Sequence, residues 1–115
     1  MDKIKLLTKQ LQKSKKILTA MGDENRLYLM IKMMQMDNCM GVRVGEIKEC
    51  TNLSRPAVSH HLQILKDAGI IDVRKEGTMN YYFFKNDQKE MKELIQSLQI
   101  AVEIAGNLPE RNREQ

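Results

Sequence analysis

The stretch of sequence that decides the fold is residues 53–65, LSRPAVSHHLQIL. At about 100° per residue, a helix places Val58, Leu62 and Leu65 on one face, with His61 at the margin of that face. The segment therefore predicts a helix with one buried face and one open face. The open face carries Pro56, Ser59, His60 and Gln63.

Both ends of this helix are marked in the sequence. Ser54 is a good N-cap because its hydroxyl can accept a hydrogen bond from a free amide of the first turn. Pro56 is tolerated there because first-turn amides have no partner within the helix. Gly69 predicts a left-handed residue at the carboxyl end.

Two amphipathic helices are predicted before this segment. Residues 3–21 place Ile4, Leu7, Leu11, Leu18 and Met21 at steps of three or four, with lysines between them. Gly22 interrupts the pattern, and Asp23 is suited to cap a second helix over residues 24–37. We expect this second helix to turn four apolar side chains inward: Leu27, Met30, Ile31 and Met34.

Shorter elements connect this helix to residues 53–65. Residues 38–41 form a loop, residues 42–44 a short extended segment and residues 45–50 a short helix, and residues 51–54 are turn-like.

The remainder of the chain predicts a hairpin and a last helix. Residues 70–84 place β-forming residues on both sides of KEGTMN, residues 75–80, which indicates two antiparallel strands with a charged tip. Asp87 and Glu90 have the spacing of a capping box that opens the last helix. Gly106 ends that helix, and residues 107–115 are a flexible polar tail. The fold class is therefore α+β and mostly helical, with one winged helix-turn-helix domain over residues 1–106.

The chemistry of the open face favours DNA over a metal or a substrate. Adjacent histidines on a helix diverge too far to bind one metal ion together, and no nucleophile signature accompanies His60 and His61, so we predict neither a metal site nor an enzyme. A short helix, a turn and a second helix with a small polar face fit a major groove, and the hairpin fits as a wing on the flanking backbone. The predicted DNA-binding residues are Ser54, Arg55, Pro56, Ala57, Ser59, His60, Gln63, Arg74, Lys75 and Thr78.

Three segments resemble, in order and spacing, the signature blocks of the ArsR/SmtB family of winged-helix bacterial repressors: MGDENRLYLM, LSRPAVSHHLQILKDAGII and RKEGTMNYYF. The resemblance covers about residues 15–85. It implies a homodimer that binds an imperfect palindromic operator on double-stranded DNA and releases it when an inducer binds. The implied dimer interface lies on the first and last helices, at Leu7, Leu11, Leu18, Met91, Leu94, Ile95, Leu98, Ala101, Val102 and Ala105.

The sequence departs from the family at both of its metal sites. Where metal-sensing relatives have a Cys-Val-Cys-Asp-Leu run, this chain has Arg43, Val44, Gly45, Glu46 and Ile47. The second family site uses histidines on the last helix, and residues 87–105 contain none. The resemblance therefore implies DNA binding without the usual metal sensing. We predict no cofactor, and the inducer is unknown.

Composition is consistent with this interpretation and leaves two alternatives open. The net charge of +4 favours an anionic partner, and six lysines stand against one aspartate in residues 1–20. No apolar run approaches the roughly 18 residues of a membrane span, so we expect a cytoplasmic protein without a membrane partner. One alternative is a helical dimer that binds another protein and not DNA. The other is a thiol-sensing repressor that uses Cys39 and Cys50.

Overall fold

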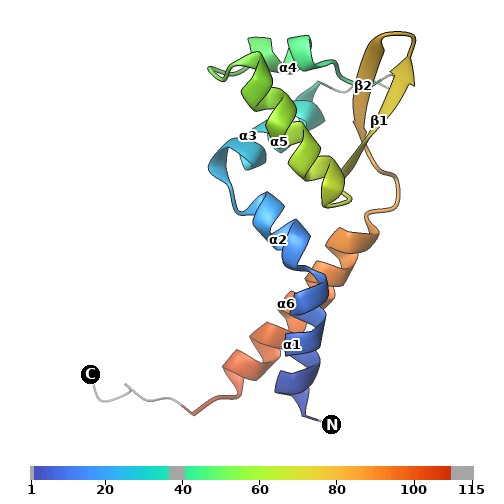
Figure 1. The fold of residues 1–115 in the computed structure, drawn as a ribbon. Coiled ribbons are helices and arrows are strands. Elements are labelled where there is room, and N and C mark those ends of the chain that lie inside the picture. The colour runs from blue at the N-terminus through green and yellow to red at the C-terminus, as the bar shows by residue number, and fades with distance from the viewer. Residues whose placement is uncertain (1, 37–40, 110–115) are drawn as a thin grey trace.

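The computed structural model describes residues 2–36 and 41–109. Over these residues the chain forms six helices and one two-stranded sheet (Figure 1). The helices are α1 (Lys3–Lys13), α2 (Lys15–Met21), α3 (Glu24–Gln35), α4 (Val44–Glu49), α5 (Arg55–Asp67) and α6 (Lys89–Gly106), and the strands are β1 (Ile71–Glu76) and β2 (Met79–Phe84).

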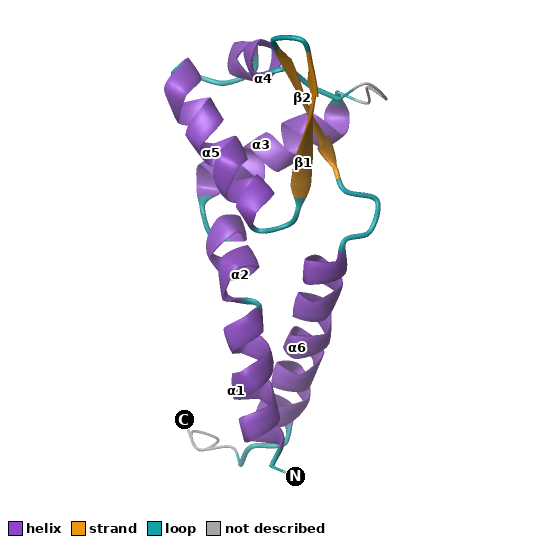
Figure 2. Cartoon of the chain, turned by 45° about the vertical axis from the view of Figure 1, so that its right-hand side comes forward, coloured by secondary structure: helices purple, strands orange, loops and turns teal. Residues whose placement is uncertain are grey.

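The molecule is elongated, with a longest dimension of 59 Å. At one end α3, α4, α5 and the β1–β2 hairpin pack together, and we call this part the winged module (Figures 1 and 2). At the other end α1 and α6 run side by side as a stalk. Helix α2 joins the stalk to the winged module.

The core lies around α5, which packs against α2, α3, α4 and β1. The apolar face predicted from residues 53–65 is buried, because Val58, Leu62 and Leu65 are each 0% exposed. The other large side chains buried with them are Ile17, Leu29, Ile47, Ile70 and Ile71.

The predicted helix ends at Asp23, Ser54 and Gly69 and the predicted hairpin are confirmed. The Ser54 side chain accepts a hydrogen bond from the Ala57 amide at 3.3 Å, and Asp23 accepts one from the Arg26 amide at 3.1 Å. Gly69 has a φ of +85°, the left-handed region where a side chain is disfavoured. The strands β1 and β2 pair antiparallel from Ile71–Phe84 to Glu76–Met79. The short extended segment before α4 contributes one bridge to this sheet, between Val42 and Tyr82.

The single helix predicted for residues 3–21 is interrupted at Ser14. The backbone of Ser14 leaves helical geometry, with φ −93° and ψ 8°, and its amide contacts the carbonyls of both Gln10 and Leu11. Helix α1 therefore follows α6, whereas α2 turns Ile17 and Ala20 into the core. The amphipathic pattern continues through the break, so it did not reveal this change of direction.

The inward face predicted for α3 was largely wrong. Of the four residues expected inside, only Met30 is buried; Leu27, Ile31 and Met34 are 42%, 53% and 60% exposed. Apolar residues occupy most of the circumference of α3, so the pattern alone does not define one buried side. Tertiary contacts select the face that carries Arg26, Leu29, Met30 and Met33.

The predicted capping box at α6 was also wrong. The helix begins at Lys89 with Gln88 at the N-cap, and no side chain caps it. The Gln88 amide group instead donates to the carbonyls of Ile70, at 2.9 Å, and Lys85, at 2.7 Å. The bond to Ile70 ties the start of α6 to the beginning of β1, a long-range contact that local spacing does not reveal.

Candidate nucleic-acid interface

The open face of α5 is a continuous polar surface on the winged module. Ser59, His60 and Gln63 are exposed on the side of the helix that points away from the buried leucines. The Gln63 amide group donates to a carboxylate oxygen of Asp67 at 2.9 Å, so its orientation is already constrained. This face presents hydrogen-bonding groups of the kind that read base edges in a major groove.

The amino-terminal end of α5 carries a positive charge and small side chains. Ser54, Arg55 and Pro56 are exposed, and Ala57 is half-buried. The Ser54 hydroxyl is already occupied in capping the helix. The Arg55 guanidinium lies near the start of α4, since a Cβ added to Gly45 would be 3.9 Å from its Nη1 atom. The predicted residues of this end therefore share one surface with the open face of α5.

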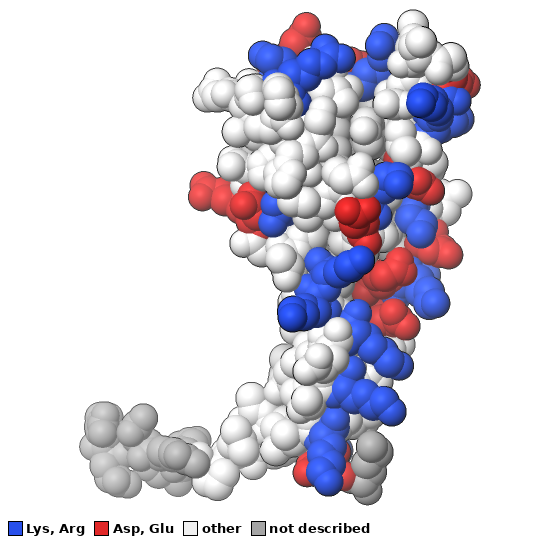
Figure 3. Space-filling model, viewed as in Figure 1, with Lys and Arg blue, Asp and Glu red and all other residues white. Residues whose placement is uncertain are grey.

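The hairpin extends from the same module. Lys75 and Thr78 are exposed beside the turn, where Gly77 has a φ of +63°. Arg74 is more constrained, because its Nε atom pairs with Glu76 at 3.3 Å and its guanidinium lies 5.2 Å from the Tyr81 ring centre. Figure 3 shows basic side chains over the region of α4 and the hairpin, with acidic ones beside them, and a further run of basic side chains along the stalk.

A buried arginine connects α5 to the rest of the chain. Arg26 is 8% exposed, and its Nε and Nη2 atoms donate to the carbonyls of Ala20, at 2.7 Å, and Thr19, at 3.1 Å, at the end of α2. Its Nη1 atom lies 3.3 Å from Nδ1 of His61 on α5, and because a guanidinium can only donate, this contact is a hydrogen bond in the tautomer whose Nδ1 accepts. Asp23 completes the cluster, with an oxygen 3.9 Å from Nη1.

The pKa values within this cluster reflect the same contacts. Burial lowers the pKa of His61 below its ordinary value of 6.5, and the Arg26 charge acts in the same direction, whereas the Asp23 carboxylate opposes them. The hydrogen bond from the Arg26 amide lowers the pKa of the Asp23 carboxyl. The two histidines thus differ as predicted: His61 is half-buried and His60 is exposed.

Sequence reasoning did not identify Arg26. One signal was available, because the third residue after an N-cap lies one turn along the helix, and its side chain points back over the cap. Arg26 occupies this position and lies on the same side of α3 as Leu29 and Met33. A charged residue placed in this way indicates a buried hydrogen-bonding partner.

The predicted dimer residues divide between exposed and enclosed positions. Leu18, Ile95, Leu98 and Val102 are 39%, 50%, 46% and 72% exposed. Ala105 is also exposed, whereas Leu94 is 5% exposed and belongs to the core of the protomer itself. The remaining predicted positions are half-buried: Leu7, Leu11, Met91 and Ala101.

The described residues also bear on metal, membrane and thiol sites. Within residues 2–36 and 41–109, no three His, Cys, Asp or Glu side chains gather into a metal site. In the same part of the chain, no helix is both long and apolar enough to cross a membrane. Cys50 is exposed, but Cys39 lies outside the described residues, so the proposed thiol pair stays a prediction.

The geometry defines a winged helix-turn-helix protein, and the comparisons with known proteins identify its family. The family model described as bacterial regulatory protein, arsR family, matches residues 23–73. An uncharacterised helix-turn-helix transcriptional regulator of Methanocaldococcus jannaschii is 39% identical over 90 residues, which are 76% of this chain and 96% of the relative. The chain belongs to the ArsR family and is a DNA-binding transcriptional regulator.

Two further relatives are named for opposite effects on transcription. The transcriptional repressor SdpR of Bacillus subtilis is 47% identical over 38 residues, 33% of this chain and 42% of the relative. The transcriptional activator HlyU of Vibrio cholerae is 36% identical over 83 residues, 71% of this chain and 73% of the relative. A solved structure of HlyU superposes with a TM-score of 0.54 at 35% identity, over 76% of this chain and 91% of that one. The winged-helix fold predicted from the sequence is thus confirmed.

Proposed function

We propose that this regulator is a cytoplasmic repressor that binds a palindromic operator as a homodimer and releases it when an inducer binds. The observation that carries the proposal is the division of α5, in which Val58, Leu62 and Leu65 are fully buried while Ser59, His60 and Gln63 are exposed together. A helix held in this way presents its polar face without disturbing the core. Among the relatives, SdpR is a named repressor and HlyU a named activator, so DNA binding is common to both and repression is the sign that we propose.

Each group has a distinct role on the duplex. Helix α5 enters the major groove, where Arg55, Ser59, His60 and Gln63 read base edges. Ser54, Pro56 and Ala57 let the start of the helix approach the backbone. Contacts to phosphate supply most of the affinity without reading sequence. On the wing these contacts come from Lys75 and Thr78, with a smaller part from Arg74, whose charge Glu76 already offsets.

The stalk supplies the second copy. Ile95, Leu98 and Val102 recur along α6 at steps of three and four and are 46–72% exposed, so one protomer leaves an apolar seam uncovered. Leu18 on α2 adds to the apolar surface. Burying such a seam against a second stalk removes apolar area from water and sets two α5 helices at a defined separation. A two-fold dimer then requires two operator half-sites about one helical turn apart.

The test is selection of bound duplexes from a random pool, followed by fluorescence anisotropy on the selected operator and on a scrambled duplex. The double variant Arg55→Ala/His60→Ala should reduce the preference for the operator to near that for the scrambled duplex, while the dimer persists. Lys92→Ala is the matched control, because it also removes one exposed charge but lies on α6. Wild-type affinity should fall steeply with salt.

Each outcome has a clear meaning. If the double variant keeps full sequence preference, the assigned face is wrong. If the protein is a dimer with no salt-sensitive affinity for any duplex, it is the protein-interaction module and not the repressor.

A further inference from the structure

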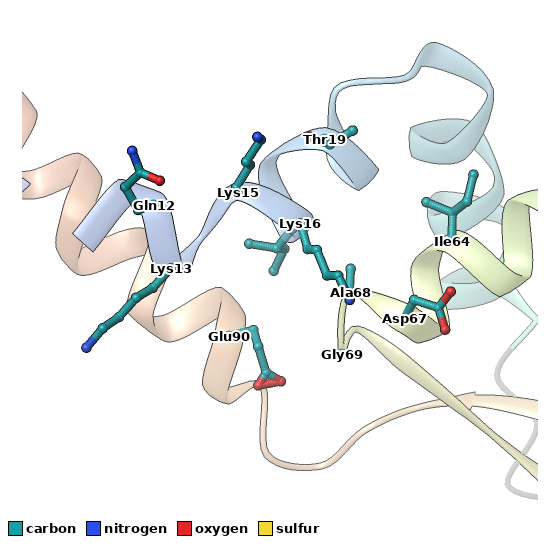
Figure 4. Close-up of a pocket in the computed structure, with 11 residues that line it drawn as sticks. Gln12, Lys13, Lys15, Lys16, Thr19, Ile64, Asp67, Ala68, Gly69 and Glu90 are labelled. Atoms are coloured by element: carbon teal, nitrogen blue, oxygen red, sulfur yellow. The ribbon is translucent and has the colours of Figure 1, made fainter. Parts of the chain in front are cut away.

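A pocket of about 780 Å³ lies where the stalk meets the winged module (Figure 4). One wall comes from the end of α1 and the start of α2, including Lys13 and Lys16. The opposite wall is the carboxyl end of α5, with Ile64 and Asp67, and Glu90 at the start of α6 closes a third side. The pocket therefore touches α5 and all three helices on the stalk side, α1, α2 and α6.

The size and floor of the pocket suit a small organic molecule. Small-molecule sites occupy about 300–1,000 Å³ and are lined mainly by apolar groups. Here Ile17 and Ala68, which are 2% and 4% exposed, contribute to the lining, and the half-buried Ile64 lies beside them. These side chains provide an apolar surface on which a hydrocarbon or aromatic body can pack.

The charges around the pocket favour an anion. Lys13, Lys15 and Lys16 outnumber the two carboxylates, Asp67 and Glu90. Asp67 already accepts a hydrogen bond from Gln63, whereas none of the three ammonium groups forms an ion pair within residues 2–36 and 41–109. In Figure 4 the Lys16 side chain extends toward Ala68, whereas the Lys13 and Lys15 side chains point away from Ala68 and Glu90, so Lys16 is the ammonium group best placed to meet a bound anion.

We infer that this pocket binds a small organic anion with an apolar body and that its occupancy weakens operator binding. The regulatory part of the inference rests on the proposed function. A ligand that contacts both α2 and the last turn of α5 binds with different affinity to each arrangement of those two helices. Because its affinity differs between these positions, the ligand shifts the equilibrium among them. If the ligand lowers the affinity for the operator, the operator lowers the affinity for the ligand by the same factor.

The test uses two fluorescent probes that share an apolar body and differ in charge: 8-anilinonaphthalene-1-sulfonate and the uncharged N-phenyl-1-naphthylamine. Their affinities are measured by fluorescence titration for the wild type, Lys16→Glu and Lys9→Glu. Both lysines are exposed, so folding should be unaffected, and Lys9 gives the same charge change outside the pocket. Lys16→Glu should weaken sulfonate binding about fivefold or more, whereas Lys9→Glu should change it less than twofold.

The uncharged probe should distinguish little between these variants. Saturating sulfonate probe should also weaken operator binding by the wild type, and much less by Lys16→Glu. Equal effects of the two substitutions, or equal binding of the two probes, would overturn the inference. Absence of operator binding without any probe would instead count against the proposed function. Intact operator binding that the probe leaves unchanged would overturn the regulatory part alone.

Discussion

Arg26 should stabilise the junction between α2, α3 and α5 through its three side-chain hydrogen bonds. Replacing it by methionine leaves a hydrophobic side chain of similar length but removes all three donors. The Thr19 carbonyl belongs to an exposed residue and can bind water, whereas Ala20 is 0% exposed, so its carbonyl has no ready substitute. A buried acceptor without a partner costs about 1–3 kcal/mol, and the lost contact to His61 adds to this.

We therefore expect Arg26→Met to lower the free energy of unfolding by about 2–3 kcal/mol, because one buried carbonyl and one ring nitrogen lose their donor. Urea unfolding at a fixed protein concentration measures this, since the stability of the proposed dimer would depend on concentration. Arg43→Met is the matched control, because Arg43 is exposed. A loss below about 0.5 kcal/mol for Arg26→Met would refute the assigned role.

A second variant separates the placement of α5 from stability. Arg26→Lys keeps the charge, but an ammonium group cannot reproduce the planar fork that reaches two carbonyls and His61. We expect operator affinity to fall while the salt dependence stays unchanged, because no phosphate contact is lost. A reduced salt slope would show that Arg26 contacts DNA, which the buried position contradicts.

Three further predictions follow from individual contacts. Because burial lowers the pKa of His61, the unfolded chain binds a proton more readily, so the free energy of unfolding should fall as pH drops below 6.5. His61→Gln should reduce this slope in urea titrations and His60→Gln should preserve it; the opposite result would contradict the assignment. Gly69→Ala should cost at least about 1 kcal/mol by thermal unfolding, because φ is +85° and the new Cβ would lie 2.2 Å from a carboxylate oxygen of α6; an unchanged stability would contradict this. Val102→Glu should shift the dimer toward monomer in sedimentation equilibrium, whereas Ile31→Glu on α3 should not; the reverse would move the interface to α3.

Local sequence signals predicted much of the winged module. Ser54, Asp23 and Gly69 mark helix ends through hydrogen bonds or backbone angles that involve only near neighbours in the chain. The split of α5 into buried and open faces also followed from residues 53–65, because Val58, Leu62 and Leu65 recur at helical spacing. Such features are visible in the sequence because their physical causes lie within a few residues.

Other features depend on contacts between distant segments. The break at Ser14 arises where α1 follows α6 and α2 enters the core, and the start of α6 is held by a bond from Gln88 to Ile70. For α3, apolar residues surround the helix, so packing selected its buried side. The pocket beside Lys16 likewise required the final arrangement of four helices, α1, α2, α5 and α6.

The sequence by itself determined that this chain forms a winged helix-turn-helix with an open polar face on α5, because caps, turns and helical periodicity are short-range properties. Only the tertiary structure showed that Arg26 joins the end of α2 to His61 and that α3 turns Ile31 outward. Those outcomes depend on which surfaces meet in three dimensions, and helical periodicity specifies a face without specifying its neighbour.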